Sequence, residues 1–189
     1  MSLQRLLVFC CVWLAFAFPH TPVSATAQAG ETWLLVDTRE NTLSVMDGER
    51  IRRSYANISI GRGGTTLDKR RNDAKTPLGE FRIARIDPDS QFHLFLGFDY
   101  PSLEQAGRAL QAGDIDGRQY LSIRQALRQS KMPPQQTALG GFLGIHGVGA
   151  GDPRIHKDFN WTSGCIALTN EQIDDLSTWV RLGMRVVVR

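Results

Sequence analysis

The chain has 189 residues, of which 42% are hydrophobic and 22% are charged, a composition typical of an ordinary globular domain. Its formal net charge of only +3 argues against a nucleic-acid-binding protein, because such proteins need dense basic patches to neutralise phosphates. The apolar residues are spread along the chain, which excludes a low-complexity disordered protein.

Residues 1–25 are predicted to be a secretory signal peptide. A single charge, Arg5, precedes an apolar run over residues 6–18, and residues 23–25 (Val-Ser-Ala) supply small side chains for signal peptidase. The run is shorter than the about 20 residues that a membrane-spanning helix needs. We expect cleavage after Ala25, with the position after Ala27 as the second choice. The alternative interpretation is an uncleaved anchor.

Cleavage leaves Cys165 as the one cysteine of the mature chain, because Cys10 and Cys11 lie in the signal. A secreted chain with one cysteine has no internal disulfide to form. Three roles are therefore open, namely an intermolecular disulfide, an inert buried thiol and a reactive thiol. An exposed idle thiol is a liability in an oxidising compartment, which favours the reactive interpretation.

Residues 26–189 are predicted to form a single β-rich domain with helical insertions, beginning with an antiparallel meander. Hydrophobic alternation and turn residues predict strands over residues 32–37, 42–46, 51–60, 81–86, 92–98, 143–147 and 185–188. Helices are predicted over residues 102–112, 120–130 and 170–182, the first two forming an insertion, Ser102–Ser130.

Caps and loops complete this outline. Thr169 is expected to cap the last helix with Gln172 as its capping-box partner, and Gly183 to end it. Residues 61–64 contain three glycines but no following Gly-Lys-Ser/Thr, so they are interpreted as a flexible loop and not as a phosphate cradle. The charged run over residues 68–73 is expected to be solvated.

The chemistry is predicted to centre on Cys165. His146 ends a short strand and Cys165 follows a loop, so two adjacent strand ends can bring the imidazole within hydrogen-bond reach of the sulfur. The amides of Gly164 and Cys165 are natural donors to an oxyanion. This combination predicts attack on a carbonyl through a thioester. It also predicts that Cys165 alkylates at pH 6 much faster than a free thiol, and that replacing His146 removes this acceleration.

Other residues offer alternatives. His156 is a second candidate for the base, and Trp161 is a candidate either for stacking on substrate or for the core. A zinc site built from His93, His146, His156 and Cys165 is disfavoured, because no CxxC or HxxxH spacing is present. We therefore expect no metal and no cofactor.

Two motifs resemble a known family. His146-Gly147, a spacer and then residues 162–166 (Thr-Ser-Gly-Cys-Ile) resemble the signature of the YkuD-type L,D-transpeptidases. Residues 76–81 (Thr-Pro-Leu-Gly-Glu-Phe) resemble the upstream Thr-Pro-x-Gly-x-Phe segment of that family. With the terminal strands, the resemblance covers about residues 33–189.

The resemblance implies a mainly β fold, a YkuD-like antiparallel β-sandwich with the cysteine at the mouth of the sheet and a helix after it. It implies that Cys165 is the nucleophile and His146 the proton acceptor and donor. Peptidoglycan stem peptides are the implied partner: the thiolate attacks the carbonyl of the L-centre of the third-position diamino acid and expels D-alanine. The acyl group then passes to a second stem, to the lysine of a wall-attached lipoprotein, or to water.

The same resemblance assigns oxyanion or substrate contacts to Gly147, Thr162, Ser163 and Gly164. With the signal, it implies a protein secreted across the inner membrane to the periplasm or cell wall, with a role in peptidoglycan biosynthesis and cell shape.

Two departures from the family signature leave other functions open. Ser163 stands where the family has histidine, and Ala167 stands where it commonly has arginine. The alternatives are an L,D-carboxypeptidase or amidase that hydrolyses the same type of linkage, and a non-catalytic peptidoglycan-binding domain. Arg62, Arg154 and Lys157 are the candidates to replace the missing positive charge.

Overall fold

The structure is a computed structural model that describes residues 30–189. The predicted signal peptide, with its cleavage positions after Ala25 and Ala27, lies outside the described residues. The strands are β1 (Thr32–Asp37), β2 (Thr42–Asp47), β3 (Arg50–Ala56), β4 (Thr65–Thr66), β5 (Thr76–Pro77), β6 (Gly79–Ser90), β7 (His93–Phe98), β8 (Gly144–His146), β9 (Ile166–Ala167) and β10 (Arg185–Val188). The helices are α1 (Leu103–Ala112), α2 (Gly117–Arg128), α3 (Pro153–Asp158) and α4 (Asn170–Ser177).

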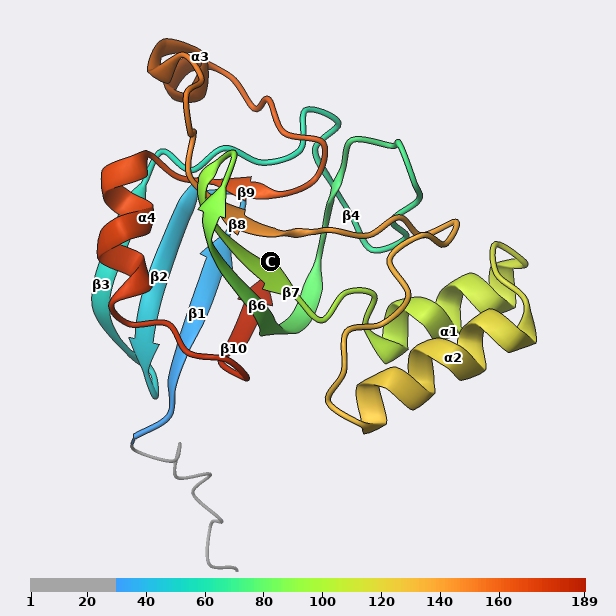
Figure 1. The fold of residues 1–189 in the computed structure, drawn as a ribbon. Helices are drawn as coiled ribbons and strands as arrows, with labels where there is room; N and C mark the ends of the chain where they lie inside the picture. The colour runs from blue at the N-terminus through green and yellow to red at the C-terminus, as the bar shows by residue number, and fades with distance from the viewer. Residues whose placement is uncertain (1–29) are drawn as a thin grey trace, which may run out of the picture.

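The predicted mainly β, YkuD-like fold is confirmed, and eight of the strands join in one mixed sheet in the order β3-β2-β1-β10-β6-β7-β8-β9 (Figure 1). The pairs β1–β10 and β8–β9 are parallel, and the other pairs in this sheet are antiparallel. The sheet is continuous because β6 is long: its first residues pair with β10 and its later residues pair with β7.

The segment that follows β3, at one edge of the sheet, pairs with β9 at the opposite edge. Ser59 and Ala167 exchange backbone hydrogen bonds of 2.9 and 2.7 Å, which join the segment after β3 to the edge strand β9. The sheet therefore curls around a single core that includes Leu34, Phe81, Leu96, Ile145, Ile166 and Val186. This closure brings residues 59–62 against the loop that carries the cysteine.

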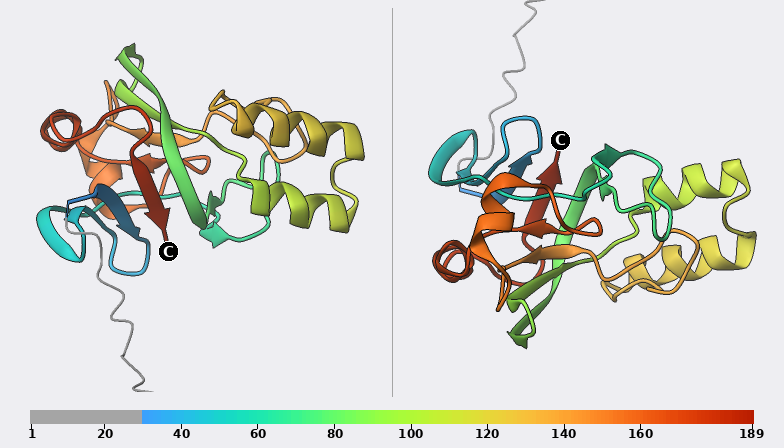
Figure 2. Two further views of the ribbon diagram at one scale, coloured as in Figure 1. Left: turned by 90° about the horizontal axis from the view of Figure 1, so that it is seen from below. Right: turned by 90° about the horizontal axis from the view of Figure 1, so that it is seen from above.

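The helical insertion is confirmed as a hairpin of α1 and α2, which Figure 2 shows projecting from one end of the sheet. Each helix starts with a capping box, Ser102 with Gln105 and Asp116 with Gln119. Asp116 makes α2 begin three residues before the predicted start. None of the helices in residues 30–189 is long and apolar enough to cross a membrane.

Several element boundaries differ from the predictions, and the ends of β3 and α4 have a local cause. β3 ends at Ala56, short of residue 60, because Asn57 has a φ of 58° that breaks the extended backbone. α4 has the predicted capping box at Thr169, but it ends at Ser177. The hydroxyls of Ser177 and Thr178 donate to carbonyls three residues earlier, which favours an early end to the helix.

The short helix α3 was missed by the sequence analysis. Asp152 caps it and Pro153 opens it, a pair of residues typical of a helix start. This short helix interrupts the loop between β8 and the cysteine, and it positions His156.

Candidate active site

Cys165 and His146 lie on neighbouring segments at one edge of the sheet. In the parallel pair of β8 and β9, Ile145 lies opposite Ile166 and His146 lies opposite Ala167. Cys165 comes directly before β9, two residues before Ala167, and so lies diagonally across from His146 in the register of this pair. The two residues that were paired from the sequence therefore lie at the same edge of the sheet.

The thiol of Cys165 is half-buried and donates a hydrogen bond to the carbonyl of Phe142 at 3.6 Å. No hydrogen bond within residues 30–189 joins it to His146. Burial raises the pKa of the thiol to about 11, although a backbone contact with Gly144 and the positive charge of Lys69 act to lower it. The raised pKa favours a neutral resting thiol and argues against the rapid alkylation at pH 6 that the sequence predicts.

His146 is 2% exposed and its ring is fixed on several sides. Its Nδ1 lies 2.7 Å from the carbonyl of Gly147, and because a carbonyl only accepts, Nδ1 carries the proton and Nε2 is free to accept one. The ring stacks on Phe92 at 4.4 Å between centroids, and Trp161 meets it edge-on at 5.7 Å. Burial lowers the pKa of His146, the Gly147 carbonyl raises it, and nearby His156 lowers it further. The imidazole is thus a neutral acceptor at neutral pH.

His156, the second candidate base, is held by Trp161 and not by the cysteine. The indole N–H of Trp161 donates to Nδ1 of His156 at 3.3 Å, and within the described chain Nε2 of His156 is buried without a hydrogen-bond partner. Burial lowers the pKa of His156, against a backbone contact with Asn57 that raises it. Trp161 thus contacts both histidines, since its ring packs against His146 in a T-shaped pair and its N–H donates to His156.

The third histidine of residues 30–189, His93, is not grouped with these residues in an ion site. His93 is exposed and its Nε2 lies 2.8 Å from Asp174. Over the span 30–189, no three His, Cys, Asp or Glu side chains are grouped so that they could hold a metal ion.

Thr162 holds the turn that presents Cys165. Its buried hydroxyl donates to the carbonyl of Cys165 at 2.6 Å and accepts from the amide of Gly164 at 3.1 Å. The Gly164 amide is therefore engaged, and the amide of Gly147 donates to Leu94 at 3.2 Å. Among the hydrogen bonds of residues 30–189, none takes the amide of Ser163 or that of Cys165, so both N–H groups are free beside the thiol.

Gly164 is required where it stands. Its φ is +132°, and a Cβ built on it would lie 2.7 Å from the carbonyl of Lys75. Thr76 follows Lys75 in the chain and is fully buried, and its hydroxyl accepts a hydrogen bond from the amide of Gly61 at 2.8 Å. The Thr-Pro segment of the second motif therefore holds Gly61, which in turn pairs with Thr162 of the cysteine turn.

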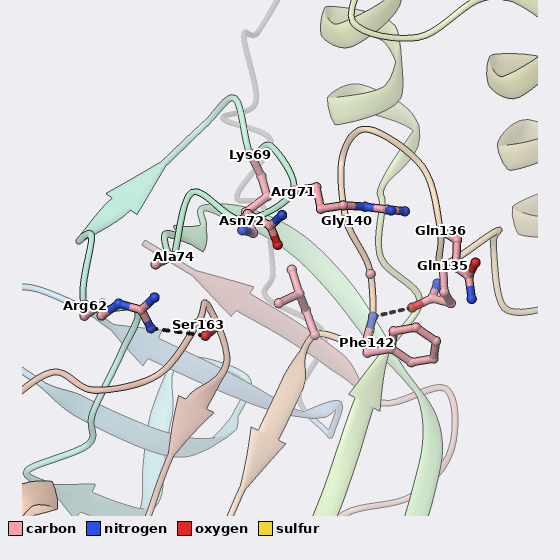
Figure 3. Close-up of a pocket in the computed structure, with 12 residues that line it drawn as sticks. Arg62, Lys69, Arg71, Asn72, Ala74, Gln135, Gln136, Gly140, Phe142 and Ser163 are labelled. Carbon is pink, nitrogen blue, oxygen red and sulfur yellow. Dashed lines mark hydrogen bonds between the residues drawn. The ribbon is translucent and has the colours of Figure 1, made fainter.

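An open groove of about 560 Å³ lies beside this turn, and Figure 3 shows the side chains that line it. Arg62, Lys69, Arg71, Gln135, Phe142 and Ser163 are among them. The guanidinium of Arg62 donates to the hydroxyl of Ser163 at 3.3 Å. Of the three candidates for a replacement charge, Arg62 is the one that lines this groove. Arg154 and Lys157 lie on α3, where Arg154 pairs with Asp152 at 2.9 Å.

Two features of the groove were not predicted from the sequence. Residues 68–73 were expected to be solvated, but the side chain of Lys69 is 4% exposed because it pairs with Asp73. The i,i+4 spacing of this pair was the one available signal. Phe142 was also missed: it is a bulky residue with a φ of 55°, and its amide is held by the side chain of Gln135 at 2.6 Å.

A neutral thiol, a neutral buried imidazole and an open cationic groove suit nucleophilic acyl transfer. Residues 31–188 match the family model of the YkuD L,D-transpeptidase catalytic domain, and the chain belongs to this family.

Solved structures share the fold at low sequence identity. The helical cell shape determining protein Pgp2 from Campylobacter jejuni is 19% identical with a TM-score of 0.55, over 87% of this chain and 51% of that one. Bd1075 from Bdellovibrio bacteriovorus is 19% identical with a TM-score of 0.52, over 87% and 50%. An L,D-transpeptidase from Xylanimonas cellulosilytica is 16% identical with a TM-score of 0.50, over 85% and 61%.

This chain therefore matches between half and about three-fifths of the length of these structures. Comparison with curated proteins gave no match.

Proposed function

We propose that this chain is a cell-wall L,D-transpeptidase in which Cys165 is the nucleophile and His146 is the general base. The proposal is supported by a half-buried thiol directly before β9 and a buried imidazole at the end of the paired strand β8, within a domain of the YkuD family. The substrate class is the peptidoglycan stem peptide.

The protonation states define the first step. With the pKa of the thiol raised and that of the imidazole lowered, the pair rests neutral and not as an ion pair. Nε2 of His146 takes the thiol proton as the sulfur attacks the carbonyl at the L-centre of the third-position diamino acid. The Cys165 amide donates to the developing oxyanion. The diagonal placement requires the thiol to turn from the Phe142 carbonyl toward the imidazole.

Collapse of the tetrahedral intermediate breaks the peptide bond. The C–N bond cleaves, the departing D-alanine takes the proton from the His146 imidazolium, and a thioester remains on Cys165. An amine then attacks the thioester, His146 accepts its proton, and the sulfur leaves with a proton restored to it. The acceptor is a second stem peptide in this proposal, and the lysine of a wall-attached lipoprotein suits the same chemistry.

Hydrolysis is the second candidate outcome. Ser163 and Ala167 replace the histidine and arginine of the family signature, and both lie within two residues of the nucleophile. Water attacking the same thioester would make the protein an L,D-carboxypeptidase. We further propose that residues 26–189 act as one catalytic domain after signal cleavage, in the periplasm or at the cell wall.

Mass spectrometry of tetrapeptide muropeptides incubated with the protein tests this proposal. Release of D-alanine together with a cross-linked dimer supports transpeptidation, and a tripeptide without dimer assigns hydrolysis. The Cys165→Ala variant is the control and should give neither product. Absence of both products with tetrapeptides and with cross-linked sacculi would favour the non-catalytic binding domain.

A further inference from the structure

We propose that Arg62 binds the α-carboxylate of the residue that leaves, so that the site selects stem peptides with a free C-terminus. This inference rests on the proposed function, because it names which part of the donor peptide the groove recognises. It also identifies a replacement for the arginine that is missing at position 167.

The chain holds Arg62 against the turn that carries the nucleophile. Its amide donates to the carbonyl of Thr162 at 3.0 Å, and its guanidinium donates to the hydroxyl of Ser163 at 3.3 Å. Thr162 is the residue whose hydroxyl closes the Cys165 turn. Arg62 is therefore anchored through its backbone to the same turn, and Figure 3 shows its side chain directed toward Ser163 at the edge of the groove.

The charge of Arg62 is available to a ligand. Arg62 is exposed and takes part in none of the ion pairs of residues 30–189, and none of the described residues that line the groove is acidic. Lys69, in contrast, is neutralised by Asp73. A guanidinium with free N–H groups binds a carboxylate through two parallel hydrogen bonds, which is the geometry that a peptide C-terminus offers.

The position of Arg62 selects among the carboxylates of the substrate. In a stem ending in D-alanine, the α-carboxylate lies one residue beyond the carbonyl that Cys165 attacks, a span of about 3.3–3.6 Å. The second carboxylate of a diamino acid is separated from that carbonyl by the whole side chain. Arg62 contacts Ser163, two residues before Cys165, and so matches the nearer group. Arg71 lies toward the opposite end of the groove in Figure 3.

A binding measurement separates this inference from the proposed function. In a Cys165→Ala background, calorimetry compares a tetrapeptide ending in free D-alanine with the same peptide ending in D-alanine amide. We expect the free acid to bind at least about tenfold more tightly, the effect of a charge-assisted hydrogen bond. Arg62→Gln should bring the two affinities together, and Arg62→Lys should restore part of the difference. Arg154→Gln is the matched control and should leave the difference unchanged.

A structural role for Arg62 would weaken the acid and the amide equally and would lower the melting temperature. Equal affinities of acid and amide with Arg62 present would overturn the inference, as would a preference that survives Arg62→Gln or a failure to bind either peptide. Failure of the proposed function gives a different result. In that case the protein with its native cysteine releases no D-alanine, although the acid is still bound more tightly than the amide.

Discussion

Two regions flank Cys165, and the chain builds them in opposite ways. On one side His146 is 2% exposed, stacked on Phe92, and fixed by the Gly147 carbonyl at 2.7 Å. On the other side the groove is open, and Arg62 is exposed with one hydroxyl contact at 3.3 Å. The first region is ordered by packing within the fold, whereas the second leaves its charge to be satisfied by a ligand.

This difference indicates a division of roles. A buried group in one fixed orientation suits a proton transfer, because the geometry exists before substrate arrives. An exposed cation suits recognition, because its interaction is made only when substrate is bound. Substitutions on the His146 side should therefore lower kcat for every substrate, whereas substitutions in the groove should change KM and the choice of substrate.

The largest expected effect is the loss of the nucleophile. Cys165→Ala should lower D-alanine release by about 10⁴-fold or more, because no other group forms the thioester. The melting temperature should change little, since the thiol is half-buried and makes one weak hydrogen bond. Product analysis by mass spectrometry and a thermal melt measure the two quantities. Turnover that persists in this variant would remove Cys165 from the mechanism.

The next effect separates the two buried histidines. His146→Asn keeps a donor for the Gly147 carbonyl but removes the acceptor nitrogen, so kcat should fall by about 10²–10⁴-fold. His156→Asn is the matched control. It should change kcat by less than about tenfold, because the hydrogen bond of His156 is to Trp161 and not to the turn that carries Cys165. Steady-state kinetics on both variants decides the assignment, and the reverse pattern would transfer the base role to His156.

The close packing of the turn that carries Cys165 can be tested by substituting Gly164. Gly164→Ala places a Cβ 2.7 Å from the Lys75 carbonyl at a φ of +132°, and should cost about 1–3 kcal/mol of stability and displace the cysteine. Gly183→Ala has a φ of +80° with nothing within 4 Å, so it isolates the conformational cost. Denaturant unfolding and activity are measured for both. Equal losses of activity in the two variants would show that the close approach to Lys75 is unimportant.

A smaller effect is expected on the pH dependence of Cys165 alkylation, which reports on the burial of the thiol. Since burial raises the pKa of Cys165 to about 11, its iodoacetamide alkylation at pH 7 should be slower than that of a free thiol and should rise up to about pH 11. The neutral thiol is favoured in the fold, so its contribution to stability is present below pH 9 and is lost as the pH rises toward 11. Peptide mass spectrometry of the alkylated Cys165 follows the rate. A plateau near pH 6 would indicate a resting ion pair with His146.

The smallest expected effect lies in the groove. Ser163→Ala removes the hydroxyl that accepts from Arg62, so KM should rise by about two- to tenfold with kcat little changed. The steady-state constants for the tetrapeptide measure this. A fall in kcat with KM unchanged would indicate that Ser163 takes part in the chemical step and not in substrate binding.

Local patterns were sufficient to predict much of the fold. Alternating strands, the capping box of Thr169 with Gln172 and the paired motifs around His146 and Cys165 are all encoded by neighbouring residues. The predicted end of α4, residue 182, lies beyond its actual end at Ser177. The apolar stripe continues past that point, but the hydroxyls of Ser177 and Thr178 donate to carbonyls of the preceding turn.

The finer features of the site depend on partners distant in sequence. The Gly147 amide is taken by Leu94 in β7, and Arg62 reaches Ser163 because the segment after β3 pairs with the cysteine loop. A linear pattern does not specify such pairings, so the engaged amides and the residues that line the groove could be identified only from the structure.

The most direct test of covalent catalysis by Cys165 is the intact mass of the protein, quenched rapidly after mixing with a tetrapeptide ending in D-alanine. The mechanism predicts an adduct on Cys165 with the mass of the acyl tripeptide, which is lost in Cys165→Ala and strongly reduced in His146→Asn. Release of D-alanine with no adduct on Cys165, and with activity retained in both variants, would contradict the mechanism.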